Sequence, residues 1–211
     1  MQFKQPTMGS NKEGKQMRKK SGLLCILLFT IVMIACAGAR VKPTASNFTT
    51  PRVTFSRVEL AHYWGWWYFS INEKPIRGKP GNYGAPLVHA FIFEIHNPNK
   101  YPVKMENFKF TLAFEDFDLN SVSSSEIQWI PAGKTNQLRL MAVTDGRAAL
   151  LRLLANKGYK FKQKKMSVWN MLEGWWDGAP DFSFPINIRK GAAVFRAGNL
   201  TRVAAFQTKY P

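Results

Sequence analysis

Few residues of this chain could carry chemistry. Three histidines, His62, His89 and His96, could act as general bases or metal ligands, because imidazole titrates near neutral pH and binds metals readily. No carboxylate or cysteine accompanies them at the spacing of a metal site. The acidic run Glu115–Asp118 could offer oxygen ligands to a divalent cation, but it lacks the remaining ligands of such a loop. We therefore expect no metal site, and we expect the acidic run to be solvated.

Catalytic motifs are missing as well. The sequence has no Gly-x-Ser-x-Gly, no glycine-rich phosphate loop and no paired carboxylates at the end of an expected strand. Both cysteines, Cys25 and Cys36, fall in the apolar N-terminal segment, so the remainder of the chain can form neither a disulfide nor a thiolate metal site. We predict a protein that is not an enzyme and binds no cofactor.

The N-terminus is typical of an export signal. A basic region, residues 1–21, precedes the continuous apolar run of residues 22–35. Met33 to Cys36 resembles a bacterial lipobox, which would place a lipid on Cys36 and leave residues 36–50 as anchor and tether. Ala37 resembles the residues that allow sorting to the outer membrane, so we expect a lipid-anchored envelope protein that faces the periplasm. An uncleaved signal anchor and ordinary cleaved secretion are the alternatives.

The charge balance favours anionic partners. Thirty Lys and Arg stand against thirteen Asp and Glu, a formal net charge of +17. On a membrane-attached protein such an excess suits anionic lipid head groups. Nucleic acid is a poor partner, because we expect the domain to lie outside the cytoplasm.

The stretch Phe91 to Met105 predicts a β-hairpin. Phe91, Phe93 and Ile95 alternate with less apolar positions, which is the period of a strand with one face in a core. Asn97-Pro98-Asn99 then forms a turn, and a second strand starts near Val103. The two asparagines could bind a ligand at this tip, or they could satisfy backbone groups of the turn.

The rest of the chain predicts more strands and one helix. Alternation from Phe108 to Phe114 indicates a half-buried strand, and we expect a turn over Ser121–Ser125. Asp145 should cap a helix over Arg147–Lys157, with Ala148, Leu151 and Leu154 in its apolar stripe and Gly158 at its C′ position. Further strands are expected over Tyr159–Val168 and around Val194–Phe206, and a loop or arm over Trp169–Pro180. Seven or eight strands with one short helix make an all-β sandwich.

Two kinds of side chain suggest an interaction surface. On the expected strands, Lys160, Lys162 and Lys164 share a face that could meet anions or lipid head groups. Trp64 and Trp66 would share one face of a strand and Trp67 would lie on the other, so both faces carry large rings. Together with Trp175 and Trp176 these rings could form an exposed patch for a bilayer or a protein partner, or they could simply pack in the core.

The order of these parts resembles a known family, the WHy (water stress and hypersensitive response) domain of the group 2 late-embryogenesis-abundant proteins. The residues that carry the likeness are Phe91, Phe93, Ile95, Asn97, Pro98, Asn99, Tyr101, Pro102, Val103, Pro131 and Gly133. The resemblance covers residues 51–211. It implies a fibronectin-III/immunoglobulin-like β-sandwich without catalytic activity and with a role in desiccation or envelope stress.

Two segments depart from the family's pattern: the aromatic insertion of residues 64–83 and the arm of residues 169–177. They leave two hypotheses. The chain is a membrane-anchored binding or protective module, or it is a structural accessory subunit that docks on an envelope complex through its aromatic arm.

Overall fold

The computed structural model describes residues 41–70, 84–164 and 167–211. The expected signal segment, the lipidation site Cys36 and residues 37–40 of the tether lie outside the described residues. The chain divides into two units, Met1–Lys42 and Pro43–Pro211. All buried hydrophobic side chains of the described residues lie between Phe48 and Ala204, so the second unit contains its own core. Among the described helices, none is long and apolar enough to cross a membrane.

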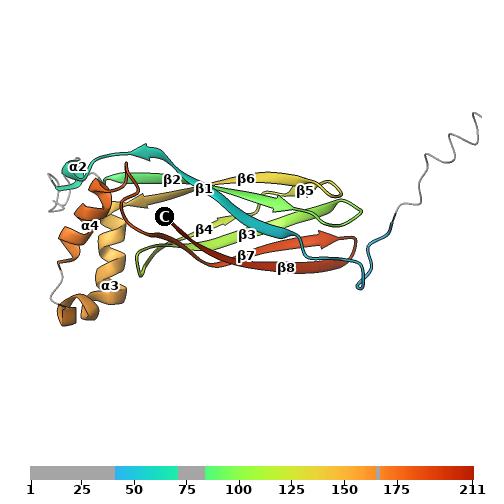
Figure 1. Cartoon of the computed structure of the whole chain (residues 1–211). Helices are drawn as coiled ribbons and strands as arrows, with labels where there is room; N and C mark the ends of the chain where they lie inside the picture. Colours follow the sequence, from blue (N-terminus) through green and yellow to red (C-terminus); the bar gives the residue numbers. More distant parts are fainter. Residues whose placement is uncertain (1–40, 71–83, 165–166) are drawn as a thin grey trace, which may run out of the picture. The chain divides into compact units, whose positions relative to one another are not determined.

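The second unit is a sandwich of two antiparallel sheets. One sheet has the strand order β1-β2-β6, and the other has the order β4-β3-β7-β8 with β5 paired to β3. Figure 1 shows the two layers. The strands are β1 (Arg52–Tyr63), β2 (Pro86–His96), β3 (Val103–Phe114), β4 (Phe117–Ser124), β5 (Gln128–Ile130), β6 (Thr135–Asp145), β7 (Ile186–Ala197) and β8 (Leu200–Tyr210). The predicted all-β sandwich of seven or eight strands is confirmed.

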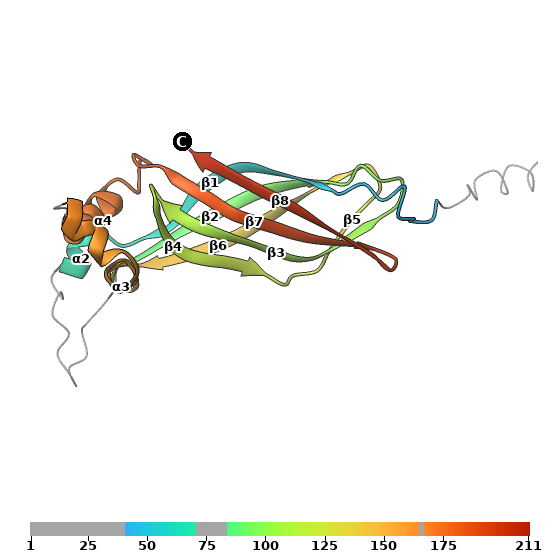
Figure 2. The ribbon, with the colours of Figure 1, turned by 90° about the horizontal axis from the view of Figure 1, so that it is seen from below.

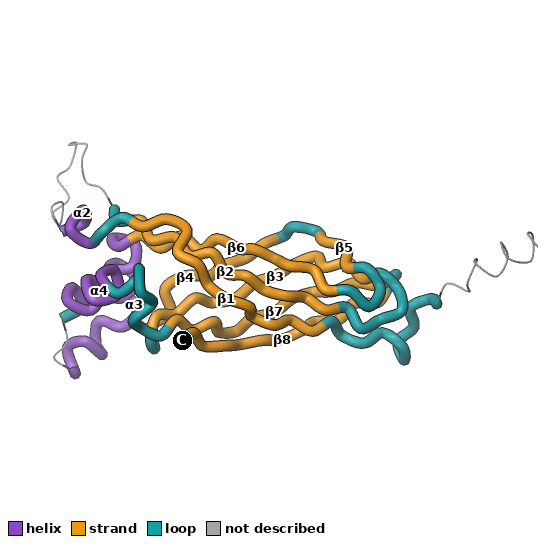
Figure 3. The backbone as a smooth tube through the Cα atoms, turned by 45° about the horizontal axis from the view of Figure 1, so that its top comes forward, coloured by secondary structure: helices purple, strands orange, loops and turns teal. Residues whose placement is uncertain are grey.

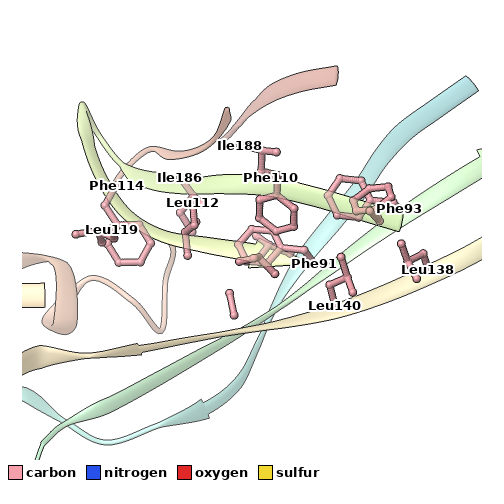
Figure 4. Close-up of a cluster of buried hydrophobic side chains, with 14 of the residues drawn as sticks. Phe91, Phe93, Phe110, Leu112, Phe114, Leu119, Leu138, Leu140, Ile186 and Ile188 are labelled. Carbon is pink, nitrogen blue, oxygen red and sulfur yellow. The ribbon is translucent and has the colours of Figure 1, made fainter. Parts of the chain in front are cut away.

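Phenylalanines from the two sheets meet in the core (Figure 4). The rings of Phe91 and Phe110 lie 5.2 Å apart, and those of Phe93 and Phe108 lie 4.8 Å apart. All four side chains are at most 2% exposed. Phe91 and Phe93 come from β2 and the other two from β3, so the period-2 pattern of both segments was interpreted correctly.

The predicted β-hairpin around Asn97-Pro98-Asn99 is wrong in its pairing. Strand β2 pairs with β1 and β6, while β3 pairs with β4, β5 and β7. The chain does run back after the turn, but in the opposite sheet. Local turn chemistry is the same for a hairpin and for a crossing between layers, so the sequence could not distinguish them.

Two other strand predictions need correction. The expected turn over Ser121–Ser125 is instead mostly strand, because β4 ends at Ser124 and the turn lies earlier, at Glu115 and Asp116. The single last strand expected around Val194–Phe206 is two strands, β7 and β8, joined at Gly198 with a φ of +58°. Glycine adopts this left-handed conformation without a steric penalty.

Three helices lie at one end of the sandwich, as all three orientations show (Figures 1, 2 and 3). They are α2 (Trp66–Ser70), α3 (Gly146–Lys164) and α4 (Val168–Asp177). The segment that leads into β1 lies at the opposite end (Figure 1).

One helix was predicted, and the part of the chain that the structure describes contains three. The expected cap is there: Asp145 Oδ1 accepts hydrogen bonds from the backbone N–H groups of Arg147 and Ala148 at 3.0 and 3.1 Å. However, α3 continues past Lys157 to Lys164, so Gly158 is inside it, and Lys160, Lys162 and Lys164 are on a helix and not on a strand. The face was also assigned wrongly, because Ala149, Leu153 and Phe161 are buried while Ala148, Leu151 and Leu154 are exposed.

The expected loop over Trp169–Pro180 is mostly α4. Ser167 caps it by accepting a hydrogen bond from the N–H of Asn170 at 3.2 Å. Its buried residues Leu172, Trp175 and Trp176 follow the i, i+3, i+4 spacing of a helix that packs on a core.

Candidate functional site

The two asparagines of the turn are fully engaged with the protein. Asn97 is 0% exposed, and its Nδ2 donates to the carbonyl oxygens of Tyr101 and Ile130 at 2.9 and 3.0 Å, with that of Pro131 at 3.1 Å. Its Oδ1 accepts from the N and Nδ2 of Asn99 at 3.0 and 2.8 Å. Asn97 thus joins the β2–β3 crossing to the end of β5, and the turn serves the architecture.

Asn99 extends this network to the segment before β1. Its Oδ1 accepts from Thr49 N, and its Nδ2 donates to Thr49 O, both at 2.8 Å. Beside this pair, the Tyr101 hydroxyl donates to Asn47 Oδ1 at 2.8 Å, and Phe48 is 4% exposed. We call the contacts of Asn47, Phe48 and Thr49 with Asn99 and Tyr101 the tether clamp.

Three of the five tryptophans predicted for an interaction surface are in the core. Trp66, Trp175 and Trp176 are 2%, 2% and 0% exposed, so the surface prediction is wrong for them. Trp66 lies 5.7 Å from Trp176, ring to ring, and Trp176 Nε1 donates to Ala85 O at 3.0 Å. The error has a physical cause: helical turns at α2 and α4 place these rings on one side, where they close the end of the sandwich.

Trp64 and Trp67 are exposed, at 38% and 65%. Trp64 follows β1 and donates its backbone N–H to Pro86 O at 3.0 Å, which continues the β1–β2 pairing. Tyr68 lies between the two rings, 4.5 Å from Trp64 and 5.4 Å from Trp67. These tryptophans therefore lie next to the outer face of the β1-β2-β6 sheet.

Aliphatic side chains continue this surface across the sheet. Val88 of β2 lies opposite Val143 of β6, and Met141 lies opposite the buried Ala90 on the same outer face. Val143 is 57% and Met141 51% exposed. We call Trp64, Trp67, Val88, Met141 and Val143 the outer patch. Sequence reasoning found the tryptophans but missed the aliphatic members, whose only signal is an apolar residue at the solvent-facing positions of two paired strands.

A charged cluster limits the outer patch on the side toward the tether clamp. Ile92 is on the same outer face, between Arg57 and Arg139, and is 0% exposed. Glu59 forms ion pairs with both arginines. Its Oε1 lies 2.8 Å from Arg57 Nε, and its Oε2 pairs with Arg139 Nη1. These pairs with Arg139 and Arg57 lower the pKa of the Glu59 carboxyl. The long side chains cover Ile92, so the exposed apolar surface ends there.

The remaining candidates do not come together. His62 is exposed on β1, His96 Nδ1 is 3.1 Å from Thr135 Oγ1, and His89 is buried. The aromatic rings of Phe91, Phe114 and Phe182 lie 5.7–6.1 Å from the His89 ring. Burial lowers the His89 pKa to about 4. Within residues 41–70, 84–164 and 167–211, no group of three His, Cys, Asp or Glu could hold a metal ion.

The acidic run is neutralised by the neighbouring strand. Arg189 lies 2.9 Å from Asp116 and 3.5 Å from Asp118, and Lys190 Nζ lies 3.4 Å from Asp118. The run is therefore part of an ion-pair network on β7. The three predicted lysines, Lys160, Lys162 and Lys164, belong to the last turns of α3, and their side chains lie outside the described set.

Comparisons with known proteins add likenesses of fold alone. No protein-family model and no curated protein matches the chain. A solved protein from Archaeoglobus fulgidus is 8% identical with a TM-score of 0.40, and covers 74% of this chain and 94% of its own. A candidate ApaA protein from Bordetella pertussis is 9% identical with a TM-score of 0.38, and the match covers 76% of this chain and 92% of that protein. A candidate late embryogenesis abundant (LEA) protein is 10% identical with a TM-score of 0.30, and the match covers 99% of this chain and 95% of that protein. With TM-scores below 0.5, these likenesses say nothing about function.

Proposed function

We propose that this chain is a non-enzymatic, membrane-tethered binding module of the bacterial cell envelope, with a protective role of the kind that the WHy resemblance implies. The observation that carries the proposal is the separation of two features of the Pro43–Pro211 unit. The tether clamp fixes the segment before β1, and the outer patch lies where β1 and β6 end and β2 begins. The helices lie at that end of the sandwich (Figure 1).

The separation follows from the length of the strands. Strand β2 runs from Pro86, beside Trp64, to His96, beside the clamp residue network at Asn97. Eleven residues of extended chain span roughly 35 Å at about 3.3 Å per residue. Within the sandwich, the outer patch therefore lies far from the tether clamp, where the segment before β1 is held.

The composition of the outer patch suits binding of a protein client. The outer patch combines two tryptophans, a methionine and two valines, with the exposed His62 beside Trp64 and opposite Val88. Exposed apolar clusters with a charged border are typical of interaction sites. Tryptophan and methionine supply large contact areas that adapt to different partners.

If the chain is instead an accessory subunit of an envelope complex, its docking surface differs from the one expected from the sequence. Trp175 and Trp176 are core residues, so docking through them is not supported. The outer patch is the surface that such a subunit would use. The two hypotheses then differ in the partner: many damaged clients, or one fixed subunit.

A protection assay tests the proposal with the full-length chain in phosphatidylcholine vesicles. We expect a freeze-labile enzyme to retain more activity after freezing with these vesicles than with empty ones. The gain should disappear in the double variant Trp67→Ser/Val143→Ser. It should persist in Val203→Ser, an equally exposed valine (58%) on β8 of the other sheet.

Two outcomes would count against protection as the function. Equal activity with wild type and empty vesicles would contradict it. Stoichiometric co-purification of one envelope protein, lost in the same double variant, would favour the accessory-subunit alternative. Mass spectrometry of the N-terminus tests the anchor: an acylated Cys36 is expected, and an unmodified chain from Met1 in the membrane fraction would exclude the lipid anchor.

A further inference from the structure

Helix α3 has a second apolar face that the sandwich does not cover. Its buried side packs through Leu153 and Phe161, whose ring is stacked 5.1 Å from Phe117 at 13°. Arg152 Nη1 also donates to Leu119 O, which ties the helix to β4. Leu151, Leu154 and Tyr159 are nevertheless 61%, 50% and 64% exposed.

These exposed residues form a stripe along the helix. At about 100° per residue, the apolar residues Ala148, Leu151, Leu154, Ala155 and Tyr159 fall within an arc of about 140°, and all five are exposed. Arg147, Gly158 and Lys162 fall in the same arc. The stripe is as wide as the core-facing side of an ordinary surface helix, and we call it the α3 stripe.

The charge of the helix indicates what the α3 stripe contacts. The 19 residues of α3 include two arginines and four lysines and no acidic residue. The neighbouring helix α4 has Glu173 and Asp177 and no basic residue, so the helical pair keeps a net positive charge. A helix with leucines and a tyrosine on its exposed face and many basic residues is the type that lies in the interface of an anionic membrane.

We propose that α3 docks on an anionic lipid surface through the α3 stripe, with Arg147 and Lys162 on the phosphate head groups. Leu151 and Leu154 enter the boundary between head groups and acyl chains, and Tyr159 lies at head-group depth. Each basic residue near such a surface strengthens binding by roughly fivefold. This inference is independent of client binding by the outer patch, because it uses different residues.

The location of α3 gives the proposal a structural consequence. The helix is at the end of the sandwich opposite the tether clamp (Figures 1 and 3). Docking of α3 is therefore a contact additional to the N-terminal attachment, and it fixes the orientation of the sandwich on the lipid.

Vesicle co-sedimentation of the Pro43–Pro211 fragment, which contains the complete core, tests the proposal without the apolar N-terminal segment. The probes are phosphatidylcholine vesicles with roughly one third phosphatidylglycerol, and pure phosphatidylcholine vesicles. We expect binding to the anionic vesicles only, and its loss in about 0.5 M salt, where the screening length falls to roughly 4 Å.

Matched variants identify the surface. Leu151→Ser/Leu154→Ser should weaken partition roughly tenfold or more, while Val203→Ser and the outer-patch variant Trp67→Ser should bind as wild type. Thermal unfolding checks that each variant is folded. Arg147→Gln/Lys162→Gln, which changes the two basic residues within the arc of the α3 stripe, should also weaken binding, and Lys109→Gln/Lys134→Gln, exposed lysines outside the helices, should not.

Three results would overturn the proposal: no binding of the wild-type fragment, equal binding to both vesicle types, or unchanged binding of the folded double-leucine variant. None of them bears on the protection assay, whose variant lies in the outer patch. Conversely, a failed protection assay with intact lipid binding would refute only the client-binding function.

Discussion

Asn99 and Thr49, fifty positions apart in the chain, exchange two hydrogen bonds of 2.8 Å, one in each direction. The side-chain amide thus pairs with a backbone N–H and C=O as a neighbouring strand would. Asn99 is 4% exposed, so water cannot easily replace either bond. Asn99 and Tyr101, which bonds to Asn47, hold the segment that leads into the sandwich by side-chain contacts and not by a β-ladder.

Replacing Asn99 by alanine should destabilise the fold by about 2–4 kcal/mol, because the part-buried N–H and C=O of Thr49 lose their partner and the buried Asn97 Oδ1 loses one of its two hydrogen bonds. Urea unfolding of the chain measures this. Asn136→Ala is the matched control: its amide donates one exposed bond to Trp129 O at 3.0 Å, so its cost should stay near 1 kcal/mol or below. Equal costs for the two variants would contradict the clamp.

His89 should make stability depend on pH. Its pKa falls from 6.5 to about 4 on burial, so between these values the unfolded chain binds more protons. The free energy of unfolding is therefore highest above pH 6.5 and falls as the pH drops. At pH 5 the protonation of His89 in the unfolded chain has lowered it by about 2 kcal/mol. Denaturant titrations between pH 7 and pH 5 measure the slope.

The His89 variant isolates this effect. In His89→Leu the decline between pH 7 and pH 5 should disappear, and the exposed His62→Gln should leave it unchanged. The lowered pKa values of Glu59 and Glu106 matter only below 4.5, outside the measured range. An unchanged slope in His89→Leu would show that another group causes it.

Alanine substitution should cost much more stability at a buried tryptophan than at an exposed one. Trp176→Ala removes a fully buried ring and its bond to Ala85 O, and should cost about 3–5 kcal/mol. Trp67→Ala, at 65% exposure, should stay within about 1 kcal/mol. Chemical denaturation compares the two. A stable, folded Trp176→Ala protein would contradict the packing of α4.

Two glycines give a direct test of the length of α3. Gly158 is in the helix interior, and a methyl group there would meet no described atom within 4 Å. Gly158→Ala should therefore stabilise the protein by about 0.5–1 kcal/mol. Gly133 also has space, but its φ is +64°, so Gly133→Ala should destabilise by about 1 kcal/mol. Destabilisation by Gly158→Ala would instead indicate a helix that ends at Lys157.

The period-2 alternation of apolar residues was sufficient to predict the main strands of the sandwich. The alternation of Phe91, Phe93 and Ile95, and that from Phe108 to Phe114, predicted β2 and β3 correctly, because a half-buried strand requires a period of two. Asp145 as a helix cap was also correct. Aromatic runs were harder: Trp64 to Phe69 fits a strand as well as it fits the start of a helix, and only packing against Trp176 selects the helix.

The sequence by itself determined the class of fold, the turn at Asn97-Pro98-Asn99, the basic excess and the scarcity of catalytic residues. These are properties of local spacing and composition. Tertiary structure decided which sheet each strand joins, which tryptophans are buried and which face of α3 remains exposed. Those outcomes depend on contacts between residues far apart in the chain, such as Asn99 with Thr49 and Trp176 with Ala85, and no local pattern encodes which partners will meet.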